Sequence, residues 1–483
     1  MQMRAHTRAF VRVSLVSLVA LGILVGAGSG TAALAQSHDS LSEAVPEYRL
    51  LRQEEDWSAL RGRSKGPALK AMSLSTGGPY LTVGGEVRAY ARWYRHQRWG
   101  GGPERDGYLL QRIMLHGSAE TRVSTALHVR GFAQLKSGLV ADRDGPVYPP
   151  DRDRLGVNQA FLELGTAGSE RAWTLRVGRQ ELHYGAGRMI AAREGPNVRL
   201  GFDAVWGRYR SDAWRVDAFV GRPTETPPGV LDNGWMPGRT LWGVYLRRGG
   251  WDGPVFSAYY LGTERSPSPA DRLLRATRHT IGARVDGTAG RLGYDLEGAM
   301  QGGRYEHRTA PAEDGAVRAW MLAGRLAYRF SDGRGQPTLG IQADLSSGDR
   351  SDTAANETFV ASYPSGRYTG AGSRLGPGNL INVRPVLGVQ FGNGLHLRLT
   401  GYAFWRMRTT DAVYAIWGAP LRTASNTNAR FVGAMPEGML TWTTGRHLRL
   451  ALEGSHFLPG PVLRESGPGR GLTHVGLRAK YVF

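Results

Sequence analysis

Alternation of apolar and polar residues with a period of two is the feature that most constrains the fold of this chain. From Tyr80 to the last residue, Phe483, such runs follow one another, separated by clusters of Gly, Pro, Asp and Asn that favour turns. Successive side chains of a strand point to opposite faces, so each run describes a strand between an apolar and a polar environment. The clearest runs are 80–94, 127–136, 172–180, 280–286, 292–301, 319–330, 339–346 and 395–408.

The number and length of the runs favour a membrane protein. There are about 18 runs of roughly 9–14 residues, joined alternately by very short and by longer connections, which is the layout of a transmembrane barrel. A soluble β-sandwich also alternates, but its strands are typically about 5–6 residues long. Glycine contributes 68 of 483 residues, which disfavours helices. The sequence therefore predicts an all-β fold, a transmembrane antiparallel β-barrel of about 18 strands over residues 79–483.

The first 78 residues differ from the rest. Residues 1–35 have a basic n-region, an apolar h-region over 13–25 and an Ala-Leu-Ala cleavage site at 33–35, which predict a signal peptide. The apolar core is short for a membrane-anchoring helix. Residues 36–78 show no alternation and are interpreted as an N-terminal periplasmic extension. The chain contains no Cys, which excludes disulfides, thiolate metal sites, a Cys nucleophile and a lipoprotein anchor.

The C-terminal run ends on an aromatic residue. One of its faces carries Val475, Leu477, Ala479, Tyr481 and Phe483. This run resembles the closing strand of bacterial outer-membrane proteins, whose terminal aromatic residue is associated with recognition by the barrel-assembly machinery. Closure also removes the unpaired strand edges that hydrocarbon penalises. The resemblance implies that the chain lies in the outer membrane, with its lipids and the assembly machinery, through Phe483, as partners.

Arginine placement carries the functional signal. Without residues 1–35 the chain has 58 Lys and Arg against 41 Asp and Glu, a net charge of +17. An arginine at the centre of the lipid face would cost about 2–4 kcal/mol, so arginines on the polar phase are expected in the lumen. A basic lumen attracts anions, and guanidinium groups bind carboxylates in a bidentate manner. The arginines on the polar phase are Arg88, Arg92, Arg130, Arg176, Arg284, Arg325, Arg329, Arg384, Arg398, Arg406 and Arg478.

A structural role for these arginines is the alternative. Inward arginines can pair with inward acids and make the barrel rigid, and both roles are expected to operate together. Because the basic residues are in surplus, pairing is incomplete, and the balance favours anion conduction. The inward acids are Glu86, Glu120, Glu163, Asp217, Asp295, Glu297, Asp344 and Glu453.

The densest motif reads LRVGRQELHYGAGR over 175–188 and continues as REGPNVRLGFD over 193–203. Here the sequence resembles the bacterial alginate export family of outer-membrane barrels. Softer matches follow at 345–349, 379–385, 411–414 and 454–457, so the resemblance covers roughly 80–483. It implies an 18-stranded monomeric barrel with an Arg-rich constriction that passes a polyuronate such as alginate. We expect no cofactor and no metal ion. A general porin for small organic anions is the alternative.

The same motif supplies the candidate site. By motif position the resemblance implies a charged constriction of Arg179, Glu181, Arg188, Arg199 and Asp203, built from a strand end and an infolded loop. Arg176 and Arg193 lie in the same stretch and add to its positive charge. Glycines and a proline within 185–197 suit a chain that folds back into the lumen. An ion-pair cluster that fixes a loop is the structural alternative.

An enzyme is the rival from another class. Histidines could act as general bases and serines as nucleophiles, but no recognised spacing, G-x-S-x-G elbow or His-rich metal pattern occurs. The loop at 346–352 has spaced carboxylates without EF-hand spacing, which favours a plain outer loop. Basic residues are dispersed at about one per strand, which does not fit a nucleic-acid surface. The candidate histidines and serines are His128, His183, His396, His456, Ser124, Ser257, Ser346 and Ser455.

Overall fold

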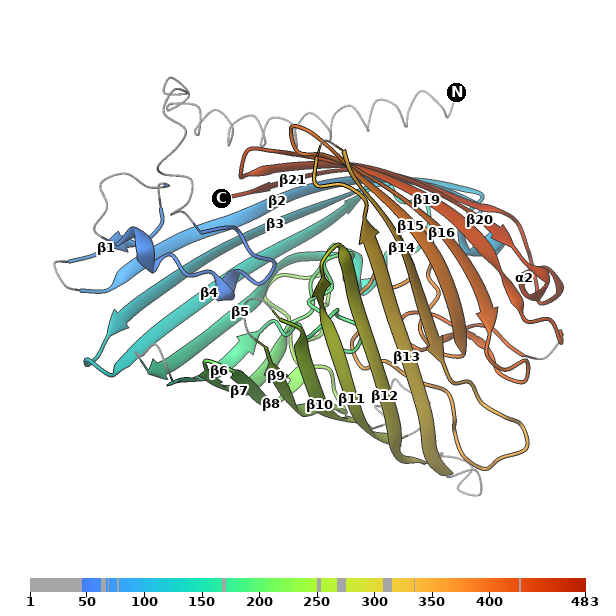
Figure 1. The fold of residues 1–483 in the computed structure, drawn as a ribbon, viewed down its shortest axis with the longest axis horizontal. Coiled ribbons are helices and arrows are strands. Elements are labelled where there is room, and N and C mark those ends of the chain that lie inside the picture. The colour runs from blue at the N-terminus through green and yellow to red at the C-terminus, as the bar shows by residue number, and fades with distance from the viewer. Residues whose placement is uncertain are drawn as a thin grey trace.

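Eighteen long antiparallel strands form one closed barrel in the computed structural model (Figure 1). The structure describes residues 46–61, 67, 69–75, 78–166, 171–249, 253–266, 275–306, 315–333, 335–424 and 427–483. The barrel strands are β2 (Tyr80–Arg95), β3 (Arg105–Arg122), β4 (Leu127–Ala141), β5 (Asp153–Thr166), β6 (Arg171–Gln180), β7 (Phe202–Ser211), β8 (Trp214–Pro223), β9 (Arg239–Arg248), β10 (Val255–Arg265), β11 (Arg275–Ala289), β12 (Leu292–Glu306), β13 (Gly315–Arg329), β14 (Gly335–Ser346), β15 (Leu380–Phe391), β16 (Leu395–Arg406), β19 (Phe431–Thr444), β20 (Leu448–Pro459) and β21 (Leu472–Val482).

The barrel closes between its first and last strands. Strand β2 pairs with β3 on one side and with β21 on the other, with partners running from Glu86 and Val482 to Arg95 and Thr473. Figure 1 shows β21, in red, beside β2, in blue. Closure satisfies the backbone groups of both edges, as a strand in hydrocarbon requires. The predicted fold class, an antiparallel barrel of about 18 strands, is confirmed.

The connections alternate in length as expected. Short turns at 123–126, 212–213, 290–291, 392–394 and 445–447 lie at the end where the barrel begins and finishes, and long connections lie at the other end. The longest are 181–201, 347–379 and 407–430. No helix in the described part of the chain is long and apolar enough to cross a membrane. The predicted signal peptide lies outside the described residues. The small elements are β1 (Met72–Ser73), η3 (Arg52–Glu54), η4 (Ser58–Leu60), η5 (Gln97–Gly100), η6 (Pro149–Asp151), β17 (Val413–Tyr414), β18 (Pro420–Arg422) and α2 (Pro461–Glu465).

Side chains alternate between an apolar outer surface and a charged lumen. On β3, Ile113 and Leu115 are 50% and 49% exposed, whereas Arg112 and Met114, which alternate with them, are almost fully buried. Many large apolar side chains are exposed on the outward phase of the other strands as well. Such a belt suits lipid rather than water.

The arginines expected in the lumen lie on the inward phase of their strands. Arg88 and Arg92 alternate with Ala89 and Ala91 on β2, and Arg88 contacts a loop inside the barrel. Cross-strand pairing extends the same phase around the wall. The inward arginines are Arg88, Arg92, Arg130, Arg176, Arg284, Arg325, Arg329, Arg384, Arg398, Arg406 and Arg478.

The described part of the N-terminal extension lies within the barrel mouth. Residues 46–61, here called the N-terminal segment, contact inward side chains of several strands rather than standing apart. Arg52 donates to the carbonyl of Phe483 over 2.8 Å, which places the segment at the end that holds the C-terminus. Sequence patterning did not indicate this placement, because irregular chain has no period.

Candidate functional site: the charged lumen

The connection between β6 and β7, residues 181–201, folds into the lumen. The side-chain amide of Asn197 donates to the carbonyls of Gln111, Leu139 and Asp151 over 2.9, 3.1 and 3.0 Å. Gly187 adopts a left-handed φ of +71°, which a residue with a side chain would adopt only with strain. The sequence prediction of an infolded segment at this motif agrees with this geometry.

A buried ion-pair cluster holds this loop to the wall, and is here called the docking cluster. Arg112 contacts both carboxylate oxygens of Glu194 at 2.7 Å and bonds Glu86 through Nε at 2.8 Å. Lys480 reaches Glu86 at 2.8 Å and Glu194 at 3.0 Å. Arg88 donates to the backbone carbonyl of Glu194 over 2.8 Å. Three cationic side chains therefore surround the carboxylates of Glu86 and Glu194. The protein's own acidic groups neutralise most of their positive charge.

Arg199 joins this loop to the N-terminal segment. Its Nε lies 3.3 Å from both Glu181 and Glu194, and its Nη2 donates to the carbonyl of Leu50 over 2.8 Å. Glu181 also accepts from the amide of Asn158 at 2.9 Å. Arg199 and Glu181, both predicted site residues, thus come together within the connection 181–201, beside its buried contact with the N-terminal segment.

Arg176 forms a second paired group on the wall. Glu163 accepts from Arg176 Nε at 2.8 Å and from Arg130 Nη2 at 2.9 Å. The guanidinium of Arg176 also lies over the rings of Phe161 and Trp206, 4.4 and 4.7 Å from their centroids. Aromatic faces and one shared carboxylate hold both arginines on the wall.

Arg188 lies on the opposite side of the lumen and borders open space. It bonds Asp295 at 3.0 Å and Glu297 at 2.7 Å. Arg284 also bonds Asp295 at 3.0 Å, and the hydroxyl of Tyr259 donates to Glu297 over 2.8 Å. Arg188 is therefore anchored by wall residues while one side of it faces a cavity.

That cavity is here called the arginine passage. It has a volume of about 230 Å³ and lies between the two infolded connections and the wall of β12 to β15. Arg384 bonds Asp344 at 3.1 Å, and Arg367 bonds Glu453 at 2.5 Å. Four arginines face two aspartates here, so the lining is positive. The polar lining consists of Arg188, Arg325, Arg367, Arg384, Asp295, Asp344, Gln342, Ser365 and Tyr368.

Arg179 and Asp203 do not join these groups. They pair with each other across β6 and β7, at 2.7 and 3.0 Å. Both lie on the strand phase of the exposed residues Val177 and Val205, opposite to the inward Arg176. Their pair therefore holds the outward side of this strand end.

Arg193 also stands apart from the arginine passage. It has a left-handed φ of +56°, and its guanidinium lies 6.0 Å from the ring centroid of Tyr363. Tyr363 belongs to the long connection 347–379, whose backbone donates to the carbonyl of Met189 over 2.7 Å. The two infolded connections thus support each other in the lumen.

The remaining inward arginines mostly have local partners. Arg92 lies 5.0 Å from the ring centroids of both Tyr90 and Tyr94, and Arg478 lies 5.6 Å from that of Tyr90. Arg406 donates to loop carbonyls, among them that of Thr427 at 2.9 Å. These contacts brace the wall and its outer connections.

Three basic residues of the site were missed by sequence reasoning: Arg112, Lys480 and Arg367. The run that holds Arg112 has apolar residues on both phases, because Leu110 and Met114 also point inward. Lys480 follows Arg478 at the strand period, which was a usable signal. Arg367 lies in an irregular connection, where no period exists.

Of the histidines and serines considered for an enzyme, His456 and Ser346 make ordinary structural contacts. His456 bonds the hydroxyl of Thr473, and the hydroxyl of Ser346 donates to the carbonyl of Leu380. In the described part of the chain, no three His, Asp or Glu side chains gather as metal ligands would. Asp349, in the loop considered for Ca²⁺, accepts from the backbone of Glu357 at 2.8 Å.

Comparison with solved structures supports the barrel. The OccK2 (OpdF) structure of Pseudomonas aeruginosa is 14% identical, with a TM-score of 0.55, over 83% of this chain and 97% of that one. A BenF-like porin from Pseudomonas fluorescens is 10% identical, with a TM-score of 0.57, over 83% and 98%. OccK2 has also been solved in complex with glucuronate, at 13% identity and a TM-score of 0.55, over 83% and 98%. At these identities the similarity shows the fold.

Sequence comparison identifies the family. No curated protein matches the chain. The family description Alginate export matches residues 79–474, which covers nearly the whole barrel and contains both halves of the motif at 175–203. This match agrees with the resemblance carried by that motif. The chain is an outer-membrane β-barrel that belongs to the alginate export family.

Proposed function

We propose that this barrel is an anion-selective channel for carboxylated sugars, up to a polyuronate such as alginate. The single observation that carries the proposal is the arginine passage, where four arginines and two aspartates line about 230 Å³ of open space. Guanidinium groups at fixed positions bind a carboxylate in a bidentate manner, and a low-dielectric wall strengthens that attraction. The glucuronate complex of the similar OccK2 barrel supports the same ligand class.

The size of the passage favours a second candidate as well. Pockets for drug-sized ligands span roughly 300–1,000 Å³, so a space of this size suits one sugar or one small organic acid. A general porin for small organic anions would use the same arginines. The two candidates differ in whether longer uronate chains enter the channel.

Block of single-channel current tests the proposal. Glucuronate, di-uronate and an aromatic acid such as benzoate are added to channels in a planar bilayer. We expect uronates to block and Arg325→Ala to weaken the block, because Arg325 lies on the inward phase and lines the arginine passage. Arg318→Ala is the matched control, since Arg318 lies on the outward phase of the same strand.

Two results would contradict the proposed site or the proposed ligand. Equal block of the wild type, Arg325→Ala and Arg318→Ala channels would show that the anion site lies outside the arginine passage. Block by benzoate with none by uronates would favour the small-acid porin.

A further inference from the structure

The N-terminal segment, residues 46–61, lies across the barrel mouth and is tied to the point of closure. Arg52 Nη2 donates to the carbonyl of Phe483 at 2.8 Å and to that of Gly85 at 3.4 Å, so it bridges β21 and β2. Arg52 also pairs with Glu55 of the same segment at 2.7 Å. These contacts are buried. They fix one side of the segment to the last residue of the chain.

The next two residues reach other parts of the wall. The amide of Gln53 accepts from Gln159 of β5 at 3.0 Å, and its backbone carbonyl accepts from Arg130 of β4 at 2.9 Å. Glu54 lies 3.3 Å from Arg208 of β7 and 3.9 Å from Arg215 of β8. Within three residues the segment therefore contacts strands from β21 round to β8. Such a span places it across the mouth rather than along one edge.

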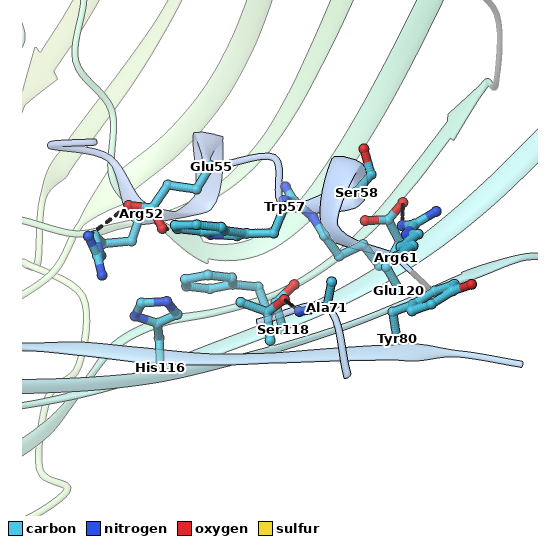
Figure 2. Close-up of a pocket in the computed structure, with 13 residues that line it drawn as sticks. Arg52, Glu55, Trp57, Ser58, Arg61, Ala71, Tyr80, His116, Ser118 and Glu120 are labelled. Atoms are coloured by element: carbon cyan, nitrogen blue, oxygen red, sulfur yellow. Dashed lines mark hydrogen bonds and ion pairs between the residues drawn. The ribbon is translucent and has the colours of Figure 1, made fainter. Parts of the chain in front are cut away.

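Little space remains beneath the segment. Figure 2 shows His116 and Ser118 of β3 on the side of the strand that faces Trp57 of the segment. The cavity between the segment and this wall has a volume of about 30 Å³, room for water but for no permeant. The ion pair between Arg61 and Glu120, at 2.9 Å, closes its far side.

The segment is held mainly by polar contacts. Its apolar anchor is small: Trp57 and Leu60 pack with Ala71 in a separate cluster, against which the half-buried Tyr48 also packs. The other contacts are hydrogen bonds to carbonyls and amides and ion pairs, which water can replace when the segment leaves. The strands, by contrast, are joined by continuous ladders. The segment is therefore no part of the ladders that keep the barrel closed.

We propose that residues 46–61 are a displaceable plug that sets the size of the permeant. With the plug seated, the channel admits molecules of single-sugar size through the arginine passage. With the plug released, the mouth opens and uronate chains enter. This inference deepens the proposed function and rests on it, because it names what limits the length of the anion that the channel accepts.

Conductance and size exclusion test the plug. The variants are a deletion of residues 46–61 and Arg52→Ala, with Arg49→Ala as the matched control, because Arg49 lies three residues earlier and its side chain is exposed. We expect the deletion to raise single-channel conductance about threefold or more, since conductance follows pore diameter. Arg52→Ala should open intermittently, and Arg49→Ala should match the wild type. Liposomes carrying the deletion should admit uronate trimers that wild-type liposomes exclude.

A labelling measurement keeps the test independent of the deletion. The chain has no Cys, so Gln53→Cys supplies a single thiol at a position that is 2% exposed. We expect a membrane-impermeant maleimide to label it slowly, and much faster when Arg52→Ala is added. If the deletion variant fails to assemble, the labelling rates of Gln53→Cys with and without Arg52→Ala still decide whether the segment is displaced.

The outcomes separate the plug from the anion channel. Unchanged conductance and unchanged size exclusion in an assembled deletion variant would overturn the plug, as would equally fast labelling with and without Arg52→Ala. A plug-free channel that is larger but prefers cations would keep the plug and overturn the proposed function.

Discussion

The docking cluster and the arginine passage use the same residue type in opposite ways. In the docking cluster, Arg112 is almost fully buried and bonds two carboxylates of the protein itself. In the arginine passage, Arg188 and Arg384 also have acidic partners, yet they line open space beside Arg325. An inward arginine therefore does not by itself make a binding site. Its contribution to selectivity depends on whether a permeant can reach it.

The largest effect that separates the two regions is expected from Arg112→Ala. The change leaves Glu86 and Glu194 short of a cation in a buried cluster, and breaking such a pair typically costs about 3–5 kcal/mol. We expect the variant barrel to unfold at a clearly lower temperature, measured by its heat-modified migration on SDS gels. Arg122→Ala, at the exposed end of the same strand, is the control. A wild-type unfolding temperature for Arg112→Ala would contradict the structural role of the cluster.

A second comparison separates Arg188 from Arg179. Arg188→Ala removes a guanidinium from the arginine passage, and loss of a hydrogen bond to a charged group costs about 1.5–3 kcal/mol, so glucuronate block should weaken at least tenfold. Arg179→Ala should leave block nearly unchanged, because Arg179 pairs with Asp203 on the outward phase. Arg188→Lys should keep selectivity and lose part of the block, since Lys lacks the bidentate fork. Equal effects of both alanine variants would place both arginines in the pathway.

The smallest expected effect is a pH dependence of the plug. Burial lowers the pKa of Lys70, which contacts the rings of Tyr48 and Trp57, to about 8. A lysine freed from the segment would keep its ordinary value near 10.4, so the seated state binds fewer protons between these two values. Seating should therefore tighten as the pH rises from 8 to 10 and stay constant well below 8, where both states are protonated. The titratable groups around Lys70 are Arg52, Glu55, Tyr48 and His116.

Channel recordings can follow this titration. We expect wild-type opening events to become rarer between pH 8 and pH 10, and Lys70→Met to remove the dependence. Opening that increases over this range would contradict the role of Lys70 beside the seated plug.

The wall of the barrel could be predicted from the sequence, and most of what fills it could not. The period of two residues predicts strands, faces and the inward arginines, because a strand repeats its orientation every second residue. The same period already places Arg179 opposite to Arg176, three positions earlier, although the motif suggested that both line the constriction. Glu194 meets Lys480 only through the fold, since 286 residues separate them along the chain.

The position of the N-terminal segment could not be predicted from the sequence either. Its contacts with Gln159, Arg208 and Phe483 are made by irregular chain, for which no repeating pattern predicts a partner. Composition could mark it as polar and outside the strands, but could not place it within the mouth. Strands can be predicted from the sequence because each residue repeats the geometry of its neighbours. The path of an irregular segment depends on single contacts between residues that are distant in the chain.

The central claim is that arginines lining open space in the lumen make the channel select anions. The most direct measurement is the reversal potential of the purified wild-type protein in a planar bilayer across a KCl gradient. Salt screens charges over about 8–10 Å near 0.1–0.15 M, so the gradient is set at low salt and repeated near 1 M. The account predicts a reversal potential of the sign set by chloride, reduced but retained at high salt. A reversal potential of the sign set by potassium at low salt would contradict it.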